Sequence, residues 1–107
     1  MNNIELLDQL FAANRELMRL IIATASTTVP DDVLEKLVQR RDQINVQIQQ
    51  VILADLAATV DQLEEAVASI QESVTKLESF KAKLADINKA IDIARSIIDT
   101  VGGILAL

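Results

Sequence analysis

The feature that most restricts the fold of this chain is the lack of any glycine or proline between Pro30 and Gly102. These are the two residue types that most often interrupt helices. One unbroken helix over residues 31–101 would be about 105 Å long, too long to be stable without partner helices beside it. Half of the 107 residues are apolar. We therefore predict an all-α fold in one domain, residues 1–107, with long antiparallel helices in a bundle or coiled coil.

The first helix is predicted over about residues 3–24. Asn2 and Glu5 have the spacing of a capping box. Apolar residues then recur at steps of three and four, which places them on one face of the helix: Ile4, Leu7, Leu10, Phe11, Leu17, Met18, Ile21 and Ile22. A loop is predicted at 24–30, because Pro30 disfavours a helical conformation at the preceding residue. Thr28 is expected to cap the next helix.

The helix that begins near residue 31 is expected to break near 57–60 or near 77–80. Thr59 and Gln62 again have capping-box spacing. Near 77–80 the apolar period slips, because a new run begins at Phe80, three residues after Leu77. We prefer the second break, near Ser79. It predicts three helices with a long central one, and a four-helix bundle is the alternative.

The segment Gln43–Ala54 carries no charged side chain. Ile44, Val46 and Ile48 alternate as they would in a strand, but the good helix formers around them favour a helix. The missing charge indicates a segment buried on more than one side, as at a subunit interface.

The last helix is predicted to end at about residue 101, followed by an apolar tail, 102–107. Its polar residues occupy a wedge of about 120°, so other helices, a second subunit or lipid must enclose the rest. Gly102 or Gly103 is expected to end the helix in the left-handed conformation, with the tail folded back on the preceding turn. The tail cannot span a membrane alone, because that requires about 20 apolar residues.

The composition argues against most kinds of chemistry. There is no His and no Cys, and no glycine-rich phosphate-binding motif. Asp61 and Glu65 lie one helical turn apart, but exposed bundle charges explain them better than a metal site does. The net charge of −6 disfavours nucleic acid. We predict no catalytic residue, no cofactor and no metal, and hence no enzyme. A first segment without a basic, apolar leader makes the cytoplasm the expected location.

Two function hypotheses follow. The first is a non-enzymatic helical assembly protein that forms a homo-oligomer or binds a protein partner through an aliphatic seam. Its predicted residues are Ile44, Ile48, Ile52, Val60, Leu63, Val67, Ile70, Val74 and Leu77. The second, less favoured, is a membrane-active helical protein, pore-forming or membrane-disrupting. Its predicted contacts, with lipid or with a partner, are Ile91, Ile97, Ile98, Ile104 and Leu105.

Overall fold

The computed structural model describes residues 3–107, and these form four α-helices packed as a bundle. The helices are α1 (Asn3–Ala23), α2 (Asp31–Leu53), α3 (Val60–Glu78) and α4 (Leu84–Leu105), and one short 3₁₀ turn, η1 (Thr24–Ser26), follows α1. The all-α prediction is confirmed. The preferred three-helix arrangement is wrong, and the four-helix alternative is the correct one.

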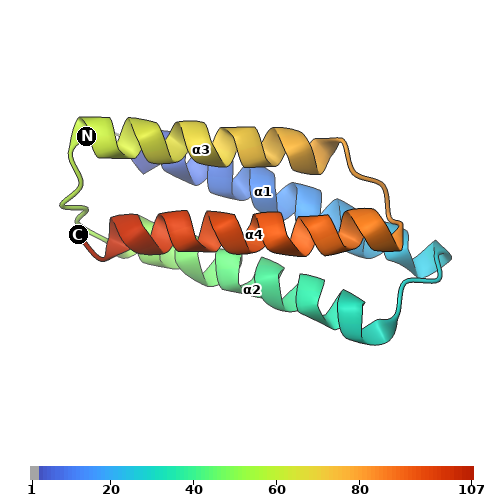
Figure 1. Ribbon diagram of the computed structural model, residues 1–107. Helices are drawn as coiled ribbons and strands as arrows, with labels where there is room; N and C mark the ends of the chain where they lie inside the picture. The colour runs from blue at the N-terminus through green and yellow to red at the C-terminus, as the bar shows by residue number, and fades with distance from the viewer. Residues whose placement is uncertain (1–2) are drawn as a thin grey trace.

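Successive helices reverse direction along a bundle of 44 × 21 × 17 Å (Figure 1). α1 packs against α2 and α3, and α4 packs against the same two helices. α1 and α3 therefore run parallel as neighbours, as do α2 and α4, and the α2–α3 connection crosses a diagonal of the bundle. The described ends of the chain lie together at one end, here called the terminal end, where this connection also lies. The α1–α2 and α3–α4 connections lie at the opposite end, here called the hairpin end.

The helix predicted to begin near residue 31 is interrupted at both of the candidate places, near 57–60 and near 77–80. α2 ends at Leu53, and α3 begins at the capping box formed by Thr59 and Gln62. Thr59 Oγ1 accepts from the Gln62 amide at 3.2 Å, and Gln62 Oε1 accepts from the Thr59 amide at 2.9 Å. The linker contains no glycine or proline, but Ala58 is buried and Leu56 packs against the core. Burial of these apolar side chains offsets the helical hydrogen bonds that the linker gives up.

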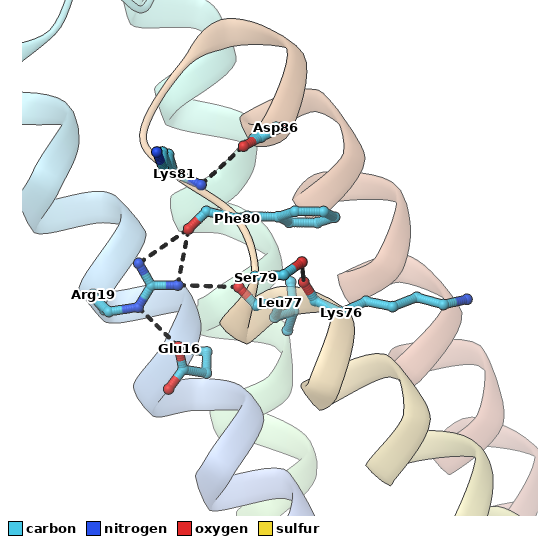
Figure 2. Close-up of polar contacts among 8 residues, drawn as sticks. All are labelled: Glu16, Arg19, Lys76, Leu77, Ser79, Phe80, Lys81 and Asp86. Carbon is cyan, nitrogen blue, oxygen red and sulfur yellow. Dashed lines mark hydrogen bonds and ion pairs between the residues drawn. The ribbon is translucent and has the colours of Figure 1, made fainter.

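The second break, between α3 and α4, is held by a side chain from α1 (Figure 2). Arg19 Nη2 donates to the carbonyl oxygens of Leu77 (3.0 Å) and Phe80 (3.2 Å), which lie at the carboxyl end of α3 and just beyond it. Its Nε pairs with Glu16 Oε1 at 2.8 Å. These contacts satisfy carbonyl groups that have no partner inside a helix, and they place a positive charge at the negative end of the α3 dipole.

The predicted cap of α2 is wrong. Pro30, not Thr28, is the N-cap residue, and its carbonyl oxygen accepts from the amides of Val33 and Leu34, both at 3.1 Å. Proline suits the start of a helix, because it has no amide to satisfy and its φ is already near the helical value. The capping box predicted at Asn2 and Glu5 lies partly outside the described residues.

The predicted end of the last helix is also wrong. α4 continues through both glycines to Leu105, and neither glycine has a positive φ. Val101 and Ile104 continue the buried face of α4, so the extra turn places Ile104 in the core. Ending the helix at residue 101 would forfeit that burial. The predicted tail that folds back is therefore absent from the described residues.

The core runs the whole length of the bundle and is almost entirely aliphatic. Gln43–Ala54, read as a helix from its flanking residues, lies in α2 up to Leu53, which confirms a helix in place of a strand. Gln47 is the buried polar residue of this segment, and its Nε2 donates to the Ile98 carbonyl oxygen of α4 at 2.8 Å. Within residues 3–107, no helix combines the length and the apolar character needed to cross a membrane.

Candidate interaction surface

Most of the residues predicted to form an intermolecular seam lie inside the bundle of a single chain. Six of the nine are buried: Ile44, Ile48, Leu63, Ile70, Val74 and Leu77. Val67 is partly buried against the same core. Only Ile52 and Val60, 49% and 56% exposed, remain open to another molecule in this fold. The heptad-like spacing that suggested a seam between chains is used within the chain, by the packing of α2 and α3 against their neighbours.

The residues predicted to meet lipid or a partner are also covered. Ile91, Ile97 and Ile104 are buried, and Ile98 and Leu105 pack partly buried against the core. They lie on α4, which α2 and α3 enclose. The sequence allowed the wide apolar face of this helix to be covered by other helices, by a second subunit or by lipid. In this fold, other helices of the same chain cover it.

An exposed apolar stripe lies instead on the solvent side of α1. Ile4, Phe11 and Ile22 are 64%, 48% and 67% exposed, and Met18 is half-buried between Phe11 and Ile22 along the helix. At 100° per residue these four positions lie within an arc of about 40°. We call this stripe, Ile4, Phe11, Met18 and Ile22, the outer α1 face.

The outer α1 face was missed because the sequence reading placed its four residues on the same face as Leu10 and Leu17, which are buried. In the structure the apolar residues of α1 range from a fully buried inner arc, through the partly buried Leu7 and Ile21, to the exposed outer α1 face. The inner arc consists of residues with no exposed surface: Leu6, Leu10, Ala13, Leu17 and Leu20. The signal that separates the outer α1 face was present in the sequence, since Ile4, Phe11 and Met18 repeat at steps of seven. Steps of seven nearly return to the same side of a helix, so they mark a stripe of their own.

Two oppositely charged residues border the outer α1 face. Asp8 and Arg15 are exposed and lie on the same flank of the stripe, within about 20° of each other around the helix. Neither forms an ion pair with another of the residues 3–107. In contrast, Arg19 is occupied with the end of α3, and Glu16 pairs with Arg19. Asp8 and Arg15 are therefore available to a second molecule.

A groove of about 380 Å³ lies between the first half of α3 and the last half of α4. Its walls include Ala66, Gly103 and Ile104, and Glu65 is its one charged lining residue. Asp61, the other carboxylate considered for a metal, is exposed on α3 and does not line the groove. Among the described residues no three His, Cys, Asp or Glu side chains converge as a metal site would require. The groove therefore has few charged groups with which to bind a ligand specifically.

The sequence matches no protein-family model, no curated protein and no solved structure. The outer α1 face presents exposed aliphatic and aromatic groups, and the charges at its border, Asp8 and Arg15, form no ion pair among residues 3–107. Such a combination is typical of a site that contacts another protein.

Proposed function

We propose that this chain is a non-enzymatic helical assembly protein whose outer α1 face packs against a helix of a second protein molecule. One observation carries the proposal: Ile4, Phe11 and Ile22 stay about half to two-thirds exposed although they lie in line on one helix. Single exposed hydrophobic residues are ordinary, but a stripe at helical spacing is the pattern by which one helix recognises another. Complete burial of a fully exposed Phe or Ile side chain contributes about 1.5–3 kcal/mol, and these partly covered side chains would contribute a part of that, against the entropy cost of association.

The bundle itself is suited to that role. Its core is supplied by inward residues of all four helices, so the outer α1 face contributes little to holding one chain together. A surface that the fold does not need is free to bind a partner. The partner helix would lie along α1, with Phe11 at the centre of the contact and the charged residues at its edge.

The experiment that tests this is a native-mass measurement on the wild-type protein and on Phe11→Glu, by light scattering over a range of concentrations. We expect the wild-type mass to rise with concentration to a small multiple of the chain mass. Phe11→Glu should stay at the chain mass, because it places a charge at the centre of the contact. Ala68→Glu is the matched control, since it adds the same charge at an exposed position of α3.

A wild-type protein that is a monomer at every concentration would direct the test to a partner of another kind. A photo-crosslinking side chain at position 11 should then capture one discrete protein that the same side chain at position 68 does not capture. If Phe11→Glu and the wild-type protein have the same mass at all concentrations, and position 11 captures nothing specific, the outer α1 face is not an interaction site and the proposal fails.

The membrane-active alternative has no comparable support. Its residues on α4 are enclosed by α2 and α3, so α4 would have to leave the bundle before they could enter lipid. Co-sedimentation with liposomes tests it directly. Full-length protein that stays in the supernatant rules it out.

A further inference from the structure

The charges on α1 are arranged so that the helix complements a reversed copy of itself. Its first half carries the acids Glu5 and Asp8, and its second half carries the bases Arg15 and Arg19, with Glu16 paired to Arg19. Asp8 and Arg15, the two that border the outer α1 face, lie at nearly equal distances along the helix on either side of residues 11–12.

We propose that the partner of the outer α1 face is the same face of a second copy of this chain, with the two α1 helices antiparallel about a two-fold axis near Ala12. This inference rests on the proposed function and names its partner. A two-fold axis at this place sets the first half of one α1 opposite the second half of the other. Asp8 of each copy then lies within about one residue, or about 1.5 Å along the axis, of the level of Arg15 in the other copy.

The apolar residues fit the same arrangement. With the axis near Ala12, Ile4 of one copy lies at a level between Met18 and Ile22 of the other, and the two Phe11 side chains meet near the centre. Side chains that fall between those of the facing helix can interdigitate as knobs in holes. The flank that bears Asp8 and Arg15 in one copy faces the same flank in the other, because antiparallel helices place like flanks together. Both charge pairs therefore form at the rim.

The charges favour the antiparallel arrangement over the parallel one. Two parallel α1 helices would turn the flank that bears Asp8 and Arg15 toward the opposite flank of the other copy, where Leu7 and Asn14 lie, so neither charge would meet an opposite charge. Contact through one helix of 21 residues falls at the small end of protein interfaces, so the dimer should dissociate on dilution. It should also weaken at high salt, because exposed ion pairs are screened.

The experiment uses two charge reversals, Asp8→Arg and Arg15→Asp, studied alone, together in one chain, and as a mixture of the two single variants. Sedimentation equilibrium gives the dissociation constant of each sample, and circular dichroism melting shows that each variant is folded. We expect either single variant alone to dimerise about tenfold more weakly than the wild-type protein, because both rim pairs become repulsive. Asp99→Arg, on the exposed side of α4, is the control and should leave dimerisation unchanged.

The mixture of the two single variants is the decisive sample. In a mixed antiparallel dimer, each rim contact joins a basic site of one chain to an acidic site of the other, so dimerisation should return to near the wild-type strength. The double variant should recover in the same way. Recovery in both samples is a result that loss of folding cannot produce.

The failures of the two proposals can be told apart. A wild-type protein that is monomeric at every concentration overturns the self-pairing, whereas the crosslinking test at position 11 still decides the proposed function. If single charge reversals dimerise like the wild-type protein while Phe11→Glu does not, the face is an interface but the antiparallel pairing is wrong. If the mixture stays as weak as the single variants, the pairing of Asp8 with Arg15 is wrong.

Discussion

α1 and α4 occupy equivalent places in the bundle, since each packs against α2 and α3, yet they expose very different surfaces. α4 has the wider apolar face, but Leu84, in its first turn, is its only large hydrophobic residue that stays exposed among the described residues. α1 leaves Ile4, Phe11 and Ile22 exposed. α4, for which the sequence more strongly predicted a covering partner, is therefore covered more completely than α1.

The difference lies in how the apolar residues are arranged around each helix. On α4 they form one continuous arc, and buried Ala90 and Ala94 within it allow neighbouring helices to approach closely. On α1 the apolar residues spread from the buried inner arc, through the partly buried Leu7 and Ile21, to the exposed outer α1 face, and the two neighbouring helices cover only the inner side of this spread. The number of apolar residues on a helix therefore does not identify an interaction surface. An interaction surface is identified by the direction in which these residues point relative to the neighbouring helices.

The largest expected effect comes from a matched pair of truncations on the two helices. Ile97→Ala removes a buried side chain of α4 and should lower the free energy of unfolding by about 2–5 kcal/mol. Ile22→Ala makes the same chemical change at an exposed position of α1 and should alter it by less than about 0.5 kcal/mol. Urea unfolding, at a concentration where both variants are monomeric, gives the two values. Similar values for both would contradict the division of α1 into an inner and an outer face.

A smaller effect is expected at Arg19, which joins α1 to the end of α3. Arg19→Met keeps much of the side-chain length and removes the hydrogen bonds to the carbonyl oxygens of Leu77 and Phe80. Because the side chain is 42% exposed, water replaces part of what is lost, and we expect destabilisation of about 1 kcal/mol. Arg15→Met, on the same helix but without a hydrogen bond or ion pair to the described part of α3, is the control for thermal unfolding of the monomer. Equal melting temperatures for the two variants would show that the contact adds no stability.

The smallest effect, and one of opposite sign, is expected at the end of α4. Gly103 lies within the helix without a positive φ, and a Cβ there would meet nothing within 4 Å. Gly103→Ala should therefore raise the free energy of unfolding by about 0.5 kcal/mol, because alanine loses less backbone freedom on folding. Gly102→Ala should act in the same direction, since its Cβ would lie at an ordinary 4.0 Å from Gln47 Nε2. Destabilisation by Gly103→Ala would instead support the left-handed ending that the sequence suggested.

Local signals were enough to find the helices and the places where the chain could turn. Pro30 marks the end of the first loop, and Thr59 with Gln62 forms the capping box that its spacing implied. Each of these signals acts within a few residues, which is why sequence alone could reveal it. Asp86 is a comparable signal that the sequence reading passed over, and its Oδ2 accepts from the Lys81 amide at 2.9 Å just before α4.

The candidate site was less accessible to sequence reasoning. An internal core requires the same spacing of apolar residues as a seam between chains or a lipid-facing helix. The spacing shows that a helix face is covered, but it does not show whether the covering residues belong to the same chain. The outer α1 face was missed for a related reason. Residues at steps of three and four from Ile4 to Ile22 can be read as one broad face until the neighbours of α1 are known.

The sequence by itself determined that the chain is helical and where helices can begin, because propensity, proline and capping act over a few residues. Only the tertiary structure decided that both candidate breaks are used, that α4 continues through its glycines, and which arc of α1 is covered. Each of those outcomes depends on apolar area buried against residues far away in the chain: Ala58 in the linker, Ile104 at the end of α4, and Leu10 facing inward while Phe11 faces out. Burial against distant neighbours is a property of the packed bundle, and no local pattern contains it.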